Sequence, residues 1–344
     1  MKWLLLSIIL GHVQACGRAR GDENRDPCQL DKGTPPPDYG YPKDSILRLN
    51  HLQAPGSHNS FHIAPAKPIS GEHRYTHTPL DDGLERLGLR QLELDIHWDR
   101  ISNKYTVFHI PGLDELSTCH FLTDCLQVVR TWSLENPGHQ PIFIFIEPKD
   151  FLDAYPITDY DLLDAEIRSV WPEDRILTPD RLQVDYLSVH ERITSEGWPT
   201  LGELRDHVLF TLLDTEVHYS GYTHGNTSLK CRVMFVDGKT NLDSPFAAII
   251  KLVNPLESTR MIQDALSRQF IVGSNVDNAT ATDVDNAARL NAALTLGVHL
   301  LSSDFPEPVV GRTYSLVLPE GTPSRCNPQT APGGCVSPDI ENLP

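Results

Sequence analysis

Short apolar runs, rich in β-branched and aromatic residues, recur along most of the chain between polar connections. Their length and composition are typical of strands that are buried in a parallel sheet. We predict eight strands, at residues 47–54, 89–97, 105–110, 141–147, 208–213, 232–236, 270–274 and 298–302.

Segments with a helical pattern separate several of these runs. In residues 79–87, Pro79 near the start and Gly88 just beyond the end have the expected polarity of helix punctuation. Further helices are predicted at residues 117–135, 159–170, 201–207, 259–268 and 284–296. Such alternation implies parallel strands joined by right-handed crossovers, and eight strands favour closure into an α/β fold of the TIM-like (β/α)8 barrel type.

Composition changes at both ends of the chain. Residues 1–16 begin with a positive charge and a short apolar run, the layout of a signal peptide, and are too short to span a bilayer, which takes about 20 apolar residues. Because Cys16 gives this stretch a loose likeness to a lipoprotein signal, secretion and lipid attachment through Cys16 both stay open. We expect an exposed N-terminal arm over residues 17–44, the barrel over 45–310 and a tail rich in Pro, Gly and Cys over 311–344.

The number of cysteines favours an exported protein. With Cys16 set aside, six of the seven remain, an even set that allows three disulfides in an oxidising compartment. The pairs easiest to propose are Cys119 with Cys125 and Cys326 with Cys335, leaving Cys28 with Cys231. Spacing alone does not fix the connectivity, and reduced, buried cysteines are the alternative.

The formal net charge is −17 and no basic run is present, which argues against a nucleic-acid partner. Strong bulk attraction to an anionic lipid surface is equally disfavoured. A lipid substrate must therefore be engaged locally, by apolar loop residues and a few cationic contacts at the mouth of a site. We expect the protein to act as a monomer.

Polar side chains stand at the downstream ends of several apolar runs. They are His58 and Asn59, Glu93 and Asp95, His109, Glu147 and Lys149, and Asp304. A parallel barrel brings the C-terminal ends of its strands to one face, so we expect these side chains to converge. Carboxylate and amide oxygens suit a hard divalent cation, and imidazoles transfer protons, a combination that suits phosphodiester cleavage.

The pair Glu93 and Asp95 is the stronger part of this pattern, because the period of a strand sends both to one face. Two inward carboxylates would be costly without a cation, whereas salt-bridged acids at a solvated strand end are the alternative. Lys149 could pair with a substrate phosphate or with Glu147. Asp304 could bind substrate or cap the exit loop.

The motifs Ser57-His58-Asn59-Ser60, Glu93-x-Asp95, His109, Asp-Glu-Leu-Ser-Thr-Cys at 114–119 and Ile-Glu-Pro-Lys at 146–149 occur in this order. Together they resemble the secreted calcium-dependent phosphoinositide-specific phospholipases C of bacteria and fungi, over most of residues 47–306. Phe61 stands where a tyrosine often follows the first motif, a minor departure. The resemblance implies a catalytic TIM-like barrel of the PLC-like phosphodiesterase type. It assigns catalysis to His58 and His109 and Ca²⁺ ligation to Asn59, Glu93, Asp95 and Glu147.

The reaction implied is intramolecular: the inositol 2-hydroxyl attacks the adjacent phosphorus, which gives a cyclic inositol phosphate and releases diacylglycerol. Ca²⁺ would lower the pKa of the hydroxyl and neutralise phosphoryl charge. Glu93, or another metal-bound carboxylate, is the candidate base; His58 would stabilise the phosphoryl group, and His109 would protonate the departing oxygen. Lys149 and Asp304 are expected to bind the phosphoinositide at the membrane surface.

Two other functions fit part of the pattern. A glycerophosphodiester phosphodiesterase has a related barrel with similar carboxylate motifs, but it usually carries Arg where this chain has Asn59. A non-catalytic exported barrel that binds a polyol or a lipid head group would not need both histidines and all the acidic residues.

Overall fold

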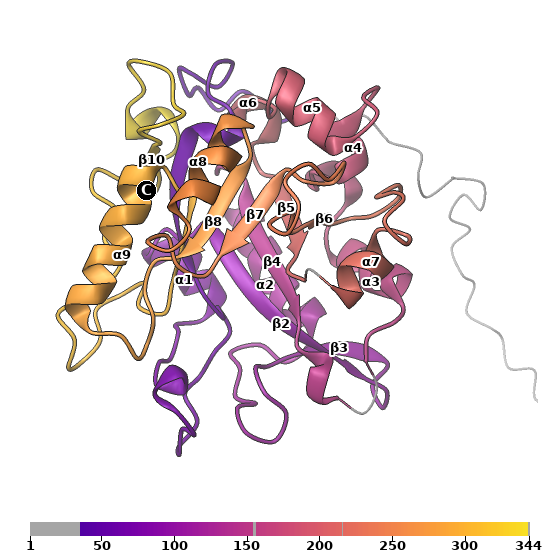
Figure 1. The fold of residues 1–344 in the computed structure, drawn as a ribbon, viewed down its shortest axis with the longest axis vertical. Coiled ribbons are helices and arrows are strands. Elements are labelled where there is room, and N and C mark those ends of the chain that lie inside the picture. Colours follow the sequence, from indigo (N-terminus) through magenta and orange to yellow (C-terminus); the bar gives the residue numbers. More distant parts are fainter. Residues whose placement is uncertain (1–34, 154–155, 215, 343–344) are drawn as a thin grey trace, which may run out of the picture.

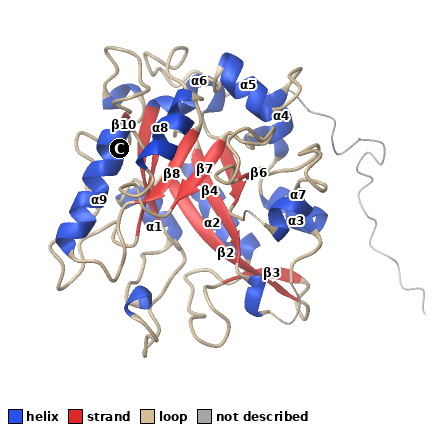
Figure 2. Cartoon of the chain, viewed as in Figure 1, coloured by secondary structure: helices blue, strands red, loops and turns tan. Residues whose placement is uncertain are grey.

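The computed structural model describes residues 35–153, 156–214 and 216–342. Within these ranges, eight parallel strands form a nearly closed barrel, and the pairing of Asp237 with Ile249 joins its two end strands. In barrel order the strands are β6 (Phe235–Val236), β5 (Val208–Leu212), β4 (Ile142–Pro148), β2 (Gln91–Asp99), β1 (Leu52–Ser57), β9 (Leu300–Ser303), β8 (Ile271–Asn275) and β7 (Ile249–Leu252). The strands lie at the centre of the molecule with helices around them (Figure 2). The predicted TIM-like α/β barrel is confirmed.

One predicted barrel strand is wrong. The run at residues 105–110 instead gives β3 (Lys104–Val107), which pairs antiparallel with the end of β2 and lies outside the barrel order. Residues 100–103 alone connect β2 to β3, and Asn103 turns the chain with φ of 55°. A parallel neighbour would need a crossover of about a dozen residues or more, so only a hairpin fits this connection. The barrel strand missing from the prediction is β7, where Lys251 interrupts a short apolar run.

Helices surround the barrel and match six predicted segments in type and place: α1, α2, α3, α6, α8 and α9. Three short helices, α4, α5 and α7, were not predicted. The α-helices are α1 (Leu80–Arg86), α2 (Leu122–Glu135), α3 (Tyr160–Val170), α4 (Pro179–Gln183), α5 (Val189–Glu196), α6 (Leu201–Leu204), α7 (Val217–Tyr222), α8 (Thr259–Ser267) and α9 (Asp283–Leu296). Short 3-10 helices are η1 (Leu49–His51), η2 (Gly71–His73), η3 (Asp150–Leu152), η4 (Glu173–Arg175) and η5 (Ser337–Asp339).

The pleat of the strands separates the barrel interior from the layer beneath the helices. On β4, Ile144 and Ile146 pack in the cluster that includes residues of α2 and α3. Phe145, between them, belongs to a different cluster, and its ring approaches Gly273 of β8 and lies over the Lys251 ammonium of β7 at 5.1 Å. Phe145 therefore fills the interior, and Glu147, two residues on, continues the same face.

The loops that follow β1 and β3 hang at one end of the barrel, at the bottom of Figure 1, whereas α5 and α6 lie at the other end. Because the strands are parallel, the lower end is the one at which C-terminal strand ends and their loops gather. This is the end at which barrel enzymes place their active sites.

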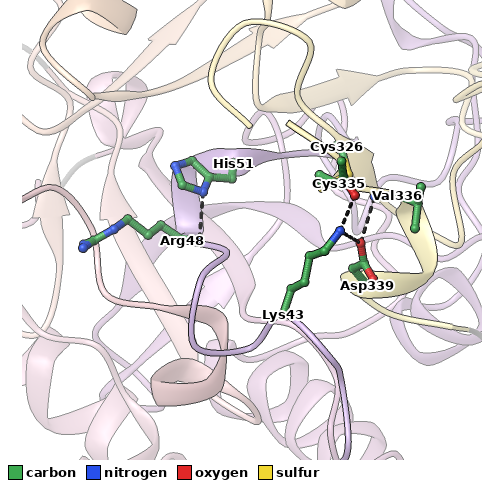
Figure 3. The surroundings of a disulfide bond; sticks show 8 residues. Lys43, Arg48, His51, Cys326, Cys335, Val336 and Asp339 are labelled. Carbon is green, nitrogen blue, oxygen red and sulfur yellow. Dashed lines mark hydrogen bonds and ion pairs between the residues drawn. A yellow bond between two sulfur atoms is a disulfide. The ribbon is translucent and has the colours of Figure 1, made fainter. Parts of the chain in front are cut away.

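The C-terminal tail is attached to the upper end of the barrel. Its strand β10 (Arg325–Cys326) pairs antiparallel with β1, and Glu341 forms a buried ion pair with Arg90. Figure 3 shows Lys43, from the segment ahead of the barrel, reaching Asp339 at 2.8 Å beside the disulfide of the tail. The segments at both ends of the described chain thus contact each other as well as the barrel.

Two of the predicted disulfides are confirmed, Cys119–Cys125 and Cys326–Cys335. Cys231 is also disulfide-bonded, and Cys28, the partner predicted for it, lies outside the described residues. The predicted signal at residues 1–16, with Cys16, lies outside them as well. In the part of the chain that the structure describes, none of the helices is long and apolar enough to cross a membrane.

Candidate active site

Three carboxylates share the inner face of the barrel at the C-terminal ends of β2 and β4. Glu93 and Asp95 alternate with leucines that pack outward, and Asp95 pairs in register with Glu147 of β4. One oxygen of each carboxylate lies within 4.8 Å of the others. The two-residue period of the strands therefore brings these sequence-predicted ligands together.

Buried oxygens in this region lack hydrogen-bond donors. Both carboxylate oxygens of Asp95 and Oδ1 of Asn59 have no partner among the described residues. Asn59 takes a φ of 46°, a conformation that asparagine tolerates better than most residues, and its Nδ2 donates to the Tyr75 hydroxyl at 3.0 Å. Unsatisfied buried acceptors are costly, and a hard cation with oxygen ligands would satisfy them. Three carboxylates and an amide oxygen are a donor set that fits Ca²⁺.

Two lysines form ion pairs with carboxylates of this acidic group and partly neutralise its charge. The ammonium of Lys149 lies 2.8 Å from Glu147 Oε1, and that of Lys251 lies 2.7 Å from Glu93 Oε2. Burial raises the pKa of Asp95 well above its usual range, whereas burial of Glu93 is outweighed by Lys251 and His58, which hold its pKa below the usual value. Glu93 is therefore ionised at neutral pH, whereas burial disfavours the ionised form of Asp95, which a further cation would stabilise.

His58 stands between two carboxylates at the edge of the acidic group. Its Nδ1 lies 2.7 Å from Asp304 Oδ1, and its Nε2 lies 3.6 Å from Glu93 Oε1. Burial lowers the pKa of His58, but Glu93 and Asp304 outweigh it and raise the pKa to about 9. The ring is thus an imidazolium at neutral pH.

Asp304 has both oxygens engaged, because Oδ2 accepts from the backbone N–H of Ala279 at 2.8 Å. A second buried acid, Asp277, supports it by accepting from the backbone N–H of Asp304 at 2.7 Å and from the Tyr314 hydroxyl at 3.0 Å. Burial and the charge of Asp304 raise the pKa of Asp277 to about 7. Asp304, the carboxylate that contacts His58, is therefore held in place by Ala279 and Asp277.

His109 lies in the loop after β3, where its Nδ1 is 2.9 Å from Asp114 Oδ2. Burial lowers the pKa of His109 more than the hydrogen bond with Asp114 raises it, and Lys149 lowers it further. Because the charge of Lys149 acts on His109 as well as on Asp95 and Glu93, this imidazole lies within electrostatic reach of the acidic group.

Three residues of this region were not among the predicted site residues: Lys251, Asp277 and Asp114. Lys251 lies on the missed strand β7, and its charge within an apolar run was the signal that marked it. Asp277 follows the end of β8, as the predicted site residues follow the ends of other strands. Asp114 lies in a loop, where no periodicity indicates the direction of a side chain.

Comparisons with known proteins agree with this geometry. The family model for Ca²⁺-dependent phosphoinositide phospholipase C matches residues 47–106 and 102–328. No curated protein matches the chain. The calcium-dependent phosphoinositol-specific phospholipase C from Pseudomonas sp., in its myoinositol complex, is similar with 20% identity over 83% of this chain and 97% of that chain, at a TM-score of 0.58.

A second solved structure is similar over the same barrel. The Ca²⁺-dependent phosphatidylinositol-specific phospholipase C from Streptomyces antibioticus has 18% identity over 76% of this chain and 96% of that chain, at a TM-score of 0.56. At such identities the two structures show a shared fold, and the family match extends over nearly the whole barrel. The chain therefore belongs to the family of calcium-dependent phosphoinositide phospholipases C, which are phosphodiesterases.

Proposed function

We propose that the protein cleaves phosphatidylinositol into diacylglycerol and a cyclic inositol phosphate, with Ca²⁺ bound at the acidic group. The observation that carries this proposal is an acidic group in which the His58 imidazolium lies 3.6 Å from Glu93, while the buried oxygens of Asp95 and Oδ1 of Asn59 lack donors. Family membership supports the lipid class. The Pseudomonas enzyme, similar in fold, was solved as a myoinositol complex.

Asn59, Glu93, Asp95 and Glu147 would hold the Ca²⁺. When bound, the ion supplies positive charge that stabilises the phosphoryl oxygens and lowers the pKa of the attacking hydroxyl. Glu93 is ionised, and its Oε1 faces His58 while Lys251 takes Oε2, so Glu93 is the proposed acceptor of the 2-hydroxyl proton.

The two histidines have different surroundings and, in our proposal, different tasks. His58 carries a proton on each nitrogen at neutral pH, which suits a hydrogen bond and a positive charge directed at the phosphoryl group. The lowered pKa of His109 makes its protonated ring a stronger acid, which would deliver the Nε2 proton to the departing glycerol oxygen and leave a neutral ring with Nδ1–H on Asp114. We assign Asp304 to the orientation of His58 rather than to substrate, because both its oxygens are engaged.

Lys149 is held by Glu147 and carries its charge beside the same group, so we propose that it attracts the substrate phosphate without leaving Glu147. Exposed apolar side chains on the surrounding loops would contact the lipid surface. They are Leu113, Leu116, Phe151 and Val253. Apolar contact is favoured over bulk charge because the net charge is −17.

We also propose that the protein is exported, by secretion or with a lipid anchor at Cys16. Support comes from the two disulfides, which form and persist in oxidising compartments.

The test is an assay of the purified protein on phosphatidylinositol vesicles, with analysis of both products. Diacylglycerol and a cyclic inositol phosphate should be released with Ca²⁺ and should stop with a chelator. Turnover of glycerophosphocholine with phosphatidylinositol untouched would favour the glycerophosphodiesterase instead. Binding of inositol without turnover of either substrate would favour a non-catalytic head-group-binding barrel.

A further inference from the structure

A buried cluster of one carboxylate and three imidazoles lies beside the active site, formed by His62, His73, His109 and Asp114, here called the three-histidine cluster. Asp114 Oδ2 lies 2.9 Å from His62 Nε2, 2.5 Å from His73 Nδ1 and 2.9 Å from His109 Nδ1. Asp114 is fully buried, and His62 and His73 are 1% and 5% exposed. One hydrogen bond to Asp114 is enough to orient His109, whereas Asp114 contacts three imidazoles.

The hydrogen bond on the far side of His62 determines where its protons are. Nδ1 of His62 lies 2.9 Å from the backbone carbonyl oxygen of Tyr75, which can only accept, so Nδ1 carries a proton. In the neutral ring, Nε2 is then a lone pair aimed at the Asp114 carboxylate. Two acceptors at this distance repel each other unless His62 takes a second proton or a cation lies between them.

We propose that the three-histidine cluster binds a zinc ion, at a site separate from the Ca²⁺ ligands. Its four donor atoms lie within 4.8 Å of one another, and tetrahedral zinc with bonds of about 2.0–2.2 Å holds its ligand atoms roughly 3.3 Å apart. The contacts of Asp114 Oδ2 with the three nitrogens, 2.5–2.9 Å, would have to open by about 0.4–0.8 Å to reach that geometry. The Tyr75 carbonyl is also the kind of partner that a metal-bound imidazole has on its other nitrogen.

The donor set discriminates between metals. Ca²⁺ takes oxygen ligands, whereas a site of three imidazoles and one carboxylate suits zinc or another borderline transition ion. Four protein ligands leave no open position, which is typical of a structural zinc site rather than a hydrolytic one. The three-histidine cluster therefore holds protein segments in place and does not activate water.

The segments joined by the ion carry the active site. His62 follows β1 four residues after His58, His73 ends η2, and His109 and Asp114 belong to the loop after β3. Zinc on Nδ1 of His109 would replace the proton that otherwise hydrogen-bonds Asp114, and the one remaining proton of the ring would then lie on Nε2, the nitrogen proposed to donate to the departing oxygen. The ion would thus fix the orientation of His109 and tie the two rim loops together.

The direct test is metal analysis of tag-free protein purified without chelators, by inductively coupled plasma mass spectrometry. We expect about one zinc per chain in the wild type and a background level in His73→Asn. His299→Asn is the matched control, because this imidazole is equally buried but contacts the carbonyl of Asn50 and the amide of Val272. It should retain zinc, as should Asp95→Asn.

A second measurement decides the matter if His73→Asn does not fold. Wild-type protein stripped of metal is titrated with Co²⁺ and with Zn²⁺ in the presence of saturating Ca²⁺. We expect bound Co²⁺ to show the visible absorption of a tetrahedral site, and Zn²⁺ to displace it and remove this absorption. We also expect Zn²⁺ to raise the melting temperature. The proposal would be overturned if the purified protein contained no zinc and neither ion changed its spectrum or melting temperature. The cluster would then be an imidazolium–carboxylate cluster without metal. Neither readout depends on phosphatidylinositol cleavage, so failure of the proposed function would be seen separately.

Discussion

His58 Nδ1 and Asp304 Oδ1 lie 2.7 Å apart, and this contact fixes both the orientation and the charge of the imidazole. Asp304 is in turn held by the backbone amide of Ala279 and by Asp277. A carboxylate held in this way stabilises the imidazolium without becoming free to bind substrate. The contact therefore connects the C-terminal ends of two neighbouring strands, because Asp304 directly follows β9 and His58 directly follows β1.

Replacement of Asp304 by asparagine tests this relationship. Asp304→Asn removes a charge that raises the pKa of His58, so we expect kcat on phosphatidylinositol to fall by about 100-fold or more. The limb of the pH profile that reports His58 should move to lower pH, because the imidazolium loses its partner. Asp185→Asn, at an exposed position, is the control and should leave kcat unchanged. A wild-type pH profile in Asp304→Asn would remove Asp304 from this role.

The Ca²⁺ site is tested by Asp95→Asn and thermal unfolding. A ligand at 100 times its Kd stabilises the native state by about 2.7 kcal/mol, so Ca²⁺ should raise the melting temperature of the wild type. The increase should largely disappear in Asp95→Asn at the same Ca²⁺ concentration, because both Asp95 oxygens lack other partners. Asp277→Asn, at a buried acid outside the acidic group, should keep the increase. An equal shift in all three proteins would contradict the assignment.

The convergence of Glu93, Asp95 and Glu147 could be predicted from sequence, because a strand has a period of two and parallel strands end on one face. The sequence marks Lys251 only as a charge within the apolar run of β7, and this signal does not indicate that its side chain enters the barrel and contacts Glu93. In the fold, Lys251 is tolerated because Glu93 neutralises it at 2.7 Å. Its contact is therefore a property of the closed barrel rather than of the local pattern.

The error at β3 has a similar origin. Apolar composition indicates a strand at Tyr105 and Val107 but gives no information on whether its neighbour is parallel or antiparallel. The short connection through Asn103 carries that information, because four residues are enough for a hairpin and too few for a parallel crossover. Contacts of Asp114 were not predictable either, because they join loops from two different strand ends.

Lipid binding is tested at Phe151, which is 71% exposed and lies two residues after Lys149, in η3. Burying such a side chain in a bilayer interface contributes about 1.5–3 kcal/mol, so Phe151→Ser should weaken binding to phosphatidylinositol vesicles about tenfold or more. Leu187→Ser is the matched control, since Leu187 is 89% exposed and lies two residues ahead of α5. Helix α5 lies at the opposite end of the barrel (Figure 1). Co-sedimentation measures both variants, and equal losses of binding would show that this rim does not contact the lipid.

The pH dependence of stability is predicted from Glu166 of α3, which lies away from the acidic group. Its Oε1 accepts from the backbone N–H of Tyr105 at 3.1 Å, while Oε2 is buried with no donor among the residues described. Burial raises the pKa of Glu166 from 4.5 to about 7. The folded protein therefore retains a proton that the unfolded chain releases, so the contribution of Glu166 to stability is complete below about pH 4.5 and is lost as the pH rises to about 7.

Glu166→Gln removes this dependence, because the amide cannot ionise and its oxygen still accepts from Tyr105. The variant should exceed the wild type in free energy of unfolding by up to about 3 kcal/mol at about pH 8, with little difference at about pH 4.5. Urea unfolding at both pH values measures the difference, and Glu135→Gln, on the exposed face of α2, should follow the wild type. If wild type and Glu166→Gln lose stability in parallel between the two pH values, then Glu166 ionises as readily in the fold as in the unfolded chain.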